Sequence, residues 1–436
     1  MFQPTVFKVR SSFVPLALAA LFLLPRTASA FTPQDDEPTG EDHTYSPTVR
    51  SVQLFKQGFE TAPPVIELGG TEPLVLRFDD LQPNPENLSY TLVHCNANWK
   101  PDDMLPGQYL HGATNAYLPV GHTSYNTLQP FNHYELVVPS EVMQPTRSGN
   151  YLLKVYRGGD EEDLVLTRRF LVFEQQARID ARVQAPRQVD MRDVAQQVDL
   201  LVATNSLPVQ DPFGDIHVSI LQNMRWDDER KDLKPRFVRG TDLVYDFPDQ
   251  GLFLAGNEYR NFDLKNLRYM TQRIQRIVPG VGERVYDAWL IPEERRTIRR
   301  YNNQRDLNGR FIIRNDQVDG DPLGADYVNV HFSLPMEAPM ASDVYVYGLL
   351  TDFQLKPEFK MNWSEADTAY TASVLLKQGF YDFSFVTKGQ EAAPDITAIE
   401  GTHYQTENEY LVLVYFSDRQ MRCDRLVGIS FINSRR

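Results

Sequence analysis

The chain has 436 residues, of which 42% are hydrophobic and 11% aromatic, and its formal net charge at pH 7 is −14. This length exceeds one typical hydrophobic core and predicts two or three domains. The negative charge argues against a nucleic-acid-binding protein, which needs clustered Lys and Arg side chains. No segment after residue 30 is apolar for long enough to predict a membrane-spanning helix.

Residues 1–30 have the pattern of a secretory signal peptide. Lys8 and Arg10 precede an apolar run from Phe13 to Leu24, and small residues follow at Ala28 and Ala30. This order predicts export and cleavage after Ala30. An uncleaved anchoring helix is the alternative, although the apolar run is shorter than the roughly 20 residues that cross a bilayer.

The next two segments are a predicted leader and a predicted N-terminal domain. Residues 31–48 are rich in Asp, Glu, Pro and Thr and predict a disordered acidic leader. Residues 49–175 contain short β-rich runs separated by turn residues, which predict a β-sandwich. These runs are Leu74–Phe78, Tyr90–Val93, Tyr134–Val138, Tyr151–Tyr156 and Leu164–Leu166.

The remainder of the chain continues the β pattern. Residues 176–324 predict a middle β-rich domain, with runs at 198–202, 216–221 and 268–277 and a linker at 315–324. Residues 325–436 predict a C-terminal immunoglobulin-like β-sandwich, with strands within 328–332, 344–347, 370–375, 381–386, 410–416 and 426–431. The predicted fold class is therefore all-β, with two or three immunoglobulin-like or early-set β-sandwich domains in tandem.

The two cysteines, Cys95 and Cys423, lie far apart in the sequence. An exported protein can pair them, but two cysteines in so long a chain do not make a disulfide framework. The sequence also lacks the paired Cys or His motifs that a zinc site usually has. Whether the two cysteines form a disulfide stays open at this point.

No catalytic motif stands out. Asp79 and Asp80 follow a predicted strand and could act as acid and base, although an Asp-rich turn has the same composition. His94 precedes Cys95, but neighbours on a strand point to opposite faces and cannot easily act on each other. The nucleophile-elbow, phosphate-loop, zinc-protease and dinucleotide motifs are absent from the sequence. We therefore predict no enzyme, with no catalytic, cofactor or metal residues.

One loop has the oxygen ligands that calcium prefers. Asn315, Asp316, Asp319 and Asp321 surround Gly320. Their spacing does not match a calcium-binding loop, and ordinary turns have a similar composition. Calcium binding and an ordinary turn both stay open as interpretations of this loop.

The last domain is similar to glycogen-binding β-sandwich modules. The resemblance lies in the segments 347–353 and 361–363. Phe353 stands near the position at which those modules usually have a sugar-stacking aromatic residue, and Trp363 follows it in the sequence. A carbohydrate-binding role requires one of these rings on an exposed face. The alternative is a shared architecture without sugar binding.

Two further hypotheses concern places where domains could meet. Residues 257–269 mix Asn, Arg, Tyr and Phe, which suits a partner interface or a hydrogen-bonded loop between domains. An enzyme site assembled between domains would need a deep pocket with convergent carboxylates or a histidine. No partner-binding residue is assigned from these patterns.

Several longer sequence segments together resemble one protein family over roughly residues 45–436. These segments lie at 89–99, 148–156, 166–170, 220–227, 256–263, 267–269, 325–328 and 406–410, and they follow one another in the same order as in that family. The chain resembles the plug protein family of the type IX secretion system of Bacteroidota.

The resemblance implies a role and not a reaction. It implies a periplasmic protein, peripherally bound to the outer membrane through a protein partner, that seals the periplasmic opening of the giant translocon barrel. It also implies no cofactor, no direct membrane insertion and a monomer. The alternative function is an exported carbohydrate-binding protein that uses its C-terminal sandwich.

Overall fold

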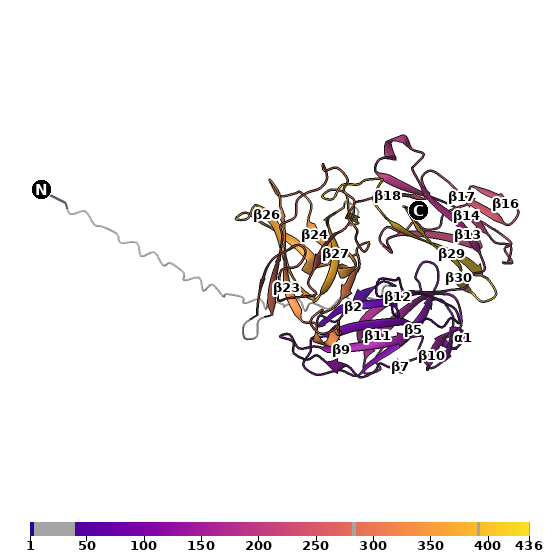
Figure 1. Ribbon diagram of the computed structural model, residues 1–436, viewed down its shortest axis with the longest axis horizontal. Coiled ribbons are helices and arrows are strands. Elements are labelled where there is room, and N and C mark those ends of the chain that lie inside the picture. The colour runs from indigo at the N-terminus through magenta and orange to yellow at the C-terminus, as the bar shows by residue number, and fades with distance from the viewer. Residues whose placement is uncertain (4–39, 281–284, 390–392, 436) are drawn as a thin grey trace. The chain divides into compact units, whose positions relative to one another are not determined.

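The computed structural model describes residues 1–3, 40–280, 285–389 and 393–435 (Figure 1). Residues 40–436 form one compact unit. Residues 4–30 of the predicted signal peptide and residues 31–39 of the predicted leader lie outside the described residues. Within the described ranges, no helix is both long enough and apolar enough to span a bilayer.

The all-β prediction is confirmed, and the first sandwich has two main sheets. One contains β1 (His43–Thr44), β12 (Leu164–Phe173), β11 (Gly149–Arg157), β5 (Leu88–Cys95) and β7 (Ala116–Tyr117), with β3 (Val65–Glu67) on β12. The other contains β2 (Val49–Lys56), β4 (Leu74–Asp80), β9 (Asn132–Val138) and β8 (His122–Thr123). The helix α1 (Pro106–Tyr109) and the pair β6 (Leu110–Gly112) and β10 (Met143–Pro145) complete this sandwich. Alternate residues such as Leu74, Leu76 and Phe78 fill its core.

The prediction of a disordered leader is wrong for its described end, residues 40–48. Strand β1 pairs with β12, and just before it Thr167 Oγ1 donates a hydrogen bond to the Glu41 carbonyl oxygen at 2.7 Å. Arg168 Nη1 donates to the carbonyl oxygen of His43 at 3.0 Å. An acidic composition alone could not reveal that β12 carries these donors, which order the leader by capturing its backbone.

The second sandwich combines strands from distant parts of the sequence. Its five-stranded sheet contains β13 (Arg178–Gln184), β14 (Ala195–Ala203), β17 (Asp242–Tyr245), β16 (Phe237–Arg239) and β18 (Leu252–Leu254). Its three-stranded sheet contains β15 (Ile216–Gln222), β29 (Glu409–Asp418) and β30 (Cys423–Asn433). Val198, Val218 and Val412 lie in the common core.

The third sandwich comes from a ten-stranded sheet. Its strands, in order, are β19 (Arg260–Asp263), β27 (Gly379–Lys388), β24 (Val344–Tyr347), β25 (Lys360–Ser364), β26 (Ala369–Lys377), β23 (Tyr327–Pro335), β21 (Tyr286–Leu290) and β20 (Ile274–Val278), while β22 (Phe311–Ile313) and β28 (Pro394–Asp395) pair with β27. Strand β25 joins the two layers, because Met361 pairs with β24 and Asn362 with β26. Short 3₁₀ turns lie at Val189–Met191, Pro322–Gly324, Leu349–Thr351 and Pro357–Phe359.

The sheets do not follow the expected division into residues 176–324 and 325–436. Strand β29 pairs with β15 along its length, from Ile216 opposite Phe416 to Gln222 opposite Tyr410. Strands β19 to β22, from the expected middle domain, belong to the third sandwich. The expected boundary near residue 324 therefore falls inside a structural unit, since sheet pairing joins segments that sequence order separates.

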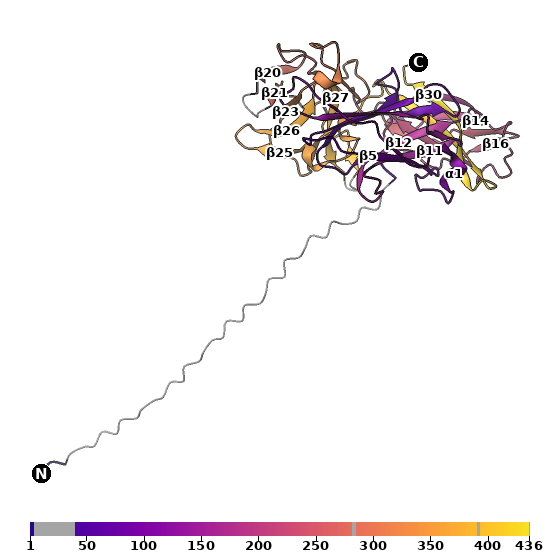
Figure 2. The same ribbon diagram turned by 90° about the horizontal axis from the view of Figure 1, so that it is seen from below.

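Strand β29 also joins the second sandwich to the first. Tyr410, Val412, Val414 and Phe416 point into the core of the second sandwich. The intervening residues Leu411, Leu413 and Tyr415 pack against Leu152 and Leu171 of the first sandwich. Figure 2 shows β30 of the same sheet close to β11 and β12. This strand is buried on both faces, which explains its uninterrupted apolar sequence.

The interleaved sheets predict how fragments will fold. A fragment of residues 40–175 contains every strand of the first sandwich and should give a cooperative thermal transition. A fragment of residues 176–324 lacks β29 and β30, so we expect it to show no cooperative transition by circular dichroism. Joining residues 176–256 to residues 405–435 through a flexible linker should restore the transition. A folded 176–324 fragment would contradict the observed sheet assignment.

Candidate functional site

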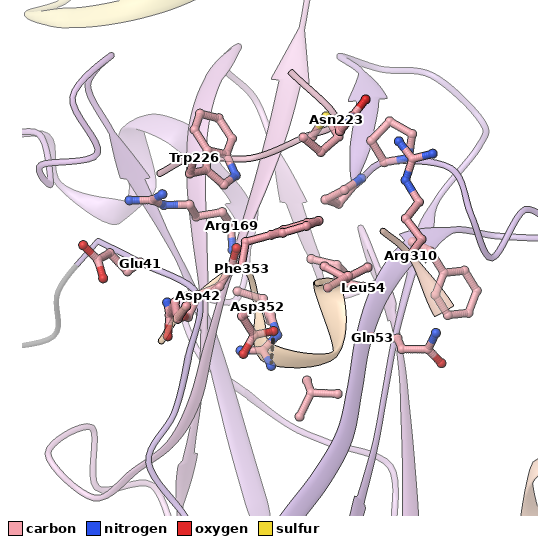
Figure 3. Close-up of a pocket in the computed structure, with 18 of the residues that line it drawn as sticks. Glu41, Asp42, Gln53, Leu54, Arg169, Asn223, Trp226, Arg310, Asp352 and Phe353 are labelled. Carbon is pink, nitrogen blue, oxygen red and sulfur yellow. Dashed lines mark hydrogen bonds and ion pairs between the residues drawn. The ribbon is translucent and has the colours of Figure 1, made fainter. Parts of the chain in front are cut away.

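The three sandwiches meet around a cavity of about 260 Å³. The first sandwich contributes residues of β2 and β12, the second contributes the loop after β15, and the third contributes the turn after β24. Figure 3 shows Arg169 and Trp226 on one side of this junction cavity and Arg310 on the opposite side. Its apolar lining includes Leu54, Met224 and Phe353.

Two unusual turns bring side chains into the junction cavity. Asn223 and Met224 have φ angles of 52° and 61°, and Asp352 and Phe353 have φ angles of 56° and 53°. Non-glycine residues rarely adopt this left-handed conformation, particularly bulky ones. Such strain persists only where the surrounding structure holds it. Here the turns bring segments of the second and third sandwiches against the first.

The acidic groups that converge on the cavity are engaged within the protein. Asp42 Oδ1 accepts a hydrogen bond from the Arg169 backbone nitrogen at 2.7 Å. Asp352 lies 3.5 Å from Arg168 and 2.5 Å from Lys356. Although burial acts to raise it, these two cations lower the pKa of Asp352 below its usual range. Asp352 therefore acts in local ion pairs, and Asp42 accepts a hydrogen bond from the backbone of β12.

Arg169 connects two sandwiches by stacking. Its guanidinium carbon lies 4.6 Å from the ring centre of Trp99 and 5.2 Å from that of Trp226. The two indole rings meet edge to face at 4.9 Å. A planar cation between aromatic rings gains both packing area and electrostatic attraction. Sequence analysis missed this residue because an isolated Arg gives no periodic signal.

The geometry gives little support to an enzyme assembled between domains. The cavity does hold convergent carboxylates, as that hypothesis requires. However, the described residues that line it include no His, Cys or Ser. Among the described residues, no cluster of three metal-ligating side chains was found either. The cavity is best described as a packed junction that fixes three sandwiches.

Asp79 forms a second junction, between the first and third sandwiches. Its Oδ2 atom lies 2.6 Å from Lys377 Nζ and accepts a hydrogen bond from the Tyr327 hydroxyl at 2.8 Å. His133 Nδ1 lies 2.6 Å from Asp79 Oδ1. Although burial acts to raise it, Lys377 and His133 lower the pKa of Asp79. Asp79 is thus a buried ion-pair partner, and Asp80 instead binds the Gln82 backbone nitrogen at 3.1 Å.

The adjacent His94 and Cys95 do not act on each other. His94 Nδ1 contacts Asp102 at 2.5 Å, and its Nε2 atom contacts the Ser148 carbonyl oxygen at 3.0 Å. Cys95 packs in the interface between the first and second sandwiches. Cys95 and Cys423 are both free and buried, and burial raises the pKa of each thiol to about 12. The structure therefore has no disulfide between them.

The acidic loop that could have bound calcium is an ordinary turn. Asn315 Nδ2 donates to the Gly324 carbonyl oxygen at 2.7 Å. Asp316 accepts from Arg314 at 2.7 Å. Asp321 caps the following 3₁₀ turn through the Leu323 nitrogen and accepts a hydrogen bond from the Tyr125 hydroxyl. These oxygens serve local structure and a contact with the first sandwich.

The aromatic residues of the carbohydrate hypothesis are not displayed as a binding platform. Phe353 is 6% exposed and lies in a cluster with Tyr259 and Tyr347. Trp363 is partly buried against the third core and stacks edge-on with Tyr370 at 5.3 Å. Phe353 is thus buried and Trp363 is half-buried against its own sandwich, so the two rings do not form an exposed stacking platform.

The segment 257–269 consists of strand β19 (Arg260–Asp263) with loop residues on either side. Asn257 Nδ2 donates to the Glu400 carbonyl oxygen at 2.8 Å, and Arg260 pairs with Glu400 at 2.9 Å. Tyr269, at its end, is 62% exposed. The contacts of Asn257 and Arg260 thus tie the segment to the loop around Glu400.

Two buried carboxyl groups next to this segment were not anticipated. Burial and the charges of Glu258 and Glu407 raise the pKa of Asp306 to about 7, although two backbone amides oppose this. Burial and the charge of Asp306 raise the pKa of Asp382 to about 8. Asp382 accepts hydrogen bonds from the backbone nitrogens of Leu307 and Gly309. No sequence motif marks them, because their environment comes from tertiary packing.

Comparison with known families decides the affiliation of the first sandwich. Residues 49–174 match the family described as "Type 9 secretion system plug protein 1st domain". These residues form a plug-family first domain. The resemblance expected from the sequence is confirmed over these residues.

Beyond the plug domain, the whole fold has a solved counterpart. The chain is similar to a hypothetical protein from Parabacteroides merdae ATCC 43184, with 29% sequence identity and a TM-score of 0.85. The similarity covers 90% of this chain and 99% of that one. No curated protein matches the chain. The plug domain therefore occurs here within a larger arrangement that the second protein shares.

Removing the Asp79 charge should strongly destabilise the plug domain and its junction with the third sandwich. Asp79→Ala leaves the buried Lys377 ammonium without its partner. We therefore expect the free energy of unfolding, measured in urea, to fall by about 3–5 kcal/mol. Asp80→Ala is the matched control and should cost about 1 kcal/mol, since it loses one hydrogen bond. The double variant Asp79→Leu with Lys377→Met should recover most of the loss. A single Asp79→Ala variant of native stability would contradict the assigned role.

The buried Asp382 should make the protein less stable as the pH rises from about 6 to 9. The pKa of Asp382 is about 8 in the folded protein, whereas that of an unfolded Asp is roughly 3.9. The protonated carboxyl group therefore stabilises the fold fully below pH ~4, and this contribution is lost as pH rises through about 8. Asp382→Asn keeps an acceptor oxygen but cannot ionise. Its stability relative to wild type should rise by about 1–3 kcal/mol between about pH 6 and 9. The exposed Asp103→Asn serves as the control, and parallel pH profiles for wild type and Asp382→Asn would refute this assignment.

Proposed function

We propose that this protein is a non-enzymatic periplasmic plug, which seals the periplasmic opening of the giant outer-membrane barrel of the type IX secretion system. The match of residues 49–174 to the plug family is the observation that carries this proposal. The predicted signal peptide supports export to the periplasm. The proposed plug works as a monomer, without a cofactor and without inserting into the membrane.

The packing of the molecule suits this task. A body that closes a wide pore must resist deformation, and close-packed apolar interfaces have low compressibility. The first and second sandwiches share the apolar interface around Leu152 and Leu413. The first and third share the buried Asp79–Lys377 pair. These contacts favour a rigid stopper over an enzyme that opens and closes around a substrate.

The alternative of an exported carbohydrate-binding protein has less support. Its two candidate rings, Phe353 and Trp363, are both engaged in packing. The described part of the chain offers no flat exposed aromatic pair at the segments that resembled a glycogen-binding module. We therefore favour the plug.

Two linked measurements test the proposed function. The tagged protein should co-purify with a very large β-barrel from detergent-solubilised outer membranes, identified by mass spectrometry. Deleting its gene should make the outer membrane permeable to large hydrophilic solutes, and the wild-type gene should restore the barrier. A gene lacking the codons for residues 13–24 is the control, because its product should stay inside the cell and fail to restore it. Absence of the barrel together with normal permeability would refute the plug function.

A further inference from the structure

A long loop of the third sandwich has features that neither the fold nor the proposed function has yet explained. Residues 291–310 join β21 to β22 and contain no helix or strand. Loops of this length inside a compact protein are uncommon and are usually functional when they are ordered. This loop is ordered by contacts at both of its ends.

A buried ion-pair network holds the first part of the loop. Arg260, which is 2% exposed, contacts Glu293 and lies 2.9 Å from Glu400. Arg296 Nε lies 2.6 Å from Glu400 Oε2, and its Nη2 atom donates to the Glu258 carbonyl oxygen at 2.8 Å. Although burial opposes it, Arg260 and Arg296 lower the pKa of Glu400 to about 2. The network therefore stays charged over the whole physiological range.

The loop is fixed again just beyond residue 300. The Tyr301 hydroxyl donates a hydrogen bond to Glu258, which also binds Arg435 at 2.7 Å. Thr297 Oγ1 donates to the Ala398 carbonyl oxygen at 2.9 Å. A loop held on both sides loses little conformational entropy when it binds a partner, which favours affinity.

Residues 295–300 are cationic, and all of them except the anchored Arg296 and Thr297 are exposed. Ile298 is 96% exposed. Arg295, Arg299 and Arg300 lie close to it in the sequence and are also exposed. Arg299 pairs with Glu294, and Arg295 donates hydrogen bonds to Thr297 Oγ1 at 2.9 Å and to the Ala398 carbonyl oxygen at 3.0 Å. This concentration of Arg contrasts with the chain's net charge of −14.

We propose that residues 295–300 form a docking loop for an acidic protein surface. Ile298 enters an apolar depression on that surface, and Arg295, Arg299 and Arg300 surround it and pair with carboxylates. Arg is enriched at protein interfaces, and an apolar centre ringed by polar groups is the usual arrangement of a small contact. The inference rests on the proposed function, in which the acidic surface belongs to the periplasmic rim of the barrel.

A protein partner fits these observations better than a lipid surface does. Binding in the membrane interface needs a broad apolar face, whereas this segment presents Ile298 alone. A fixed loop with one apolar side chain is suited to a shaped protein surface.

Binding of purified variants to the purified barrel in detergent tests the docking loop. Arg299→Glu with Arg300→Glu should weaken binding by about tenfold or more, and it should flatten the salt dependence between about 50 and 300 mM sodium chloride. Ile298→Ser should weaken binding by about fivefold without changing the salt dependence. The matched controls are Arg178→Glu and Val189→Ser, which alter exposed side chains of the second sandwich. The controls should bind as wild type does, and all variants should keep the wild-type melting temperature.

The outcomes separate the docking loop from the proposed function. If wild type and the loop variants bind the barrel equally well, the docking loop is wrong and the plug function stands. If wild type does not bind the barrel, both are overturned. Vesicles containing phosphatidylglycerol provide the second arm. Binding to them that depends on Arg299 and Arg300 would overturn the proposal of a protein surface.

Discussion

Strand β29 has no face toward solvent, and the arrangement of the other strands depends on this. Its alternate side chains fill the core of the second sandwich and the interface with the first. Because β29 comes from the end of the chain, the second sandwich is completed by a segment that follows the strands of the third sandwich in the sequence. The sandwiches are thus interleaved along the chain, and a body built in this way resists separation of its parts.

Polar contacts then determine how the sandwiches are oriented relative to one another, which apolar packing alone does not fix. The Asp79–Lys377 pair is buried, and the ammonium also lies 3.9 Å from the Phe131 ring centre. A buried pair adds little net stability over an apolar substitute, but it strongly disfavours geometries that would leave one charge unpaired. The stacking of Arg169 between Trp99 and Trp226 has the same effect at the first and second sandwiches. Such contacts define one relative placement of the sheets.

Local patterns revealed the strands well and their partners poorly. The alternation of Val328, Val330 and Phe332 predicted β23, and the apolar run around Val412 predicted β29. Which sheet receives a strand depends on contacts across the whole chain, so the pairing of β15 with β29 was not predictable from periodicity. The candidate sites depend even more on tertiary packing. Asp79 stood out as part of an acidic pair, yet its partner Lys377 has no local signature.

The third sandwich shows how stability and recognition can be assigned to different groups. Burying Arg260 with Glu293 and Glu400 is an inefficient way to stabilise a core, since well-packed apolar residues do so without desolvating charges. Fixing the conformation of one loop is a task for which directional ion pairs are well suited. Apolar burial in β29 thus keeps the body rigid, while the buried ions hold residues 295–300 in a defined position. In the proposed plug, a contact made mainly by exposed charges has a further consequence. Charges speed association more than they slow dissociation, which suits a stopper that must be removed for cargo and returned quickly.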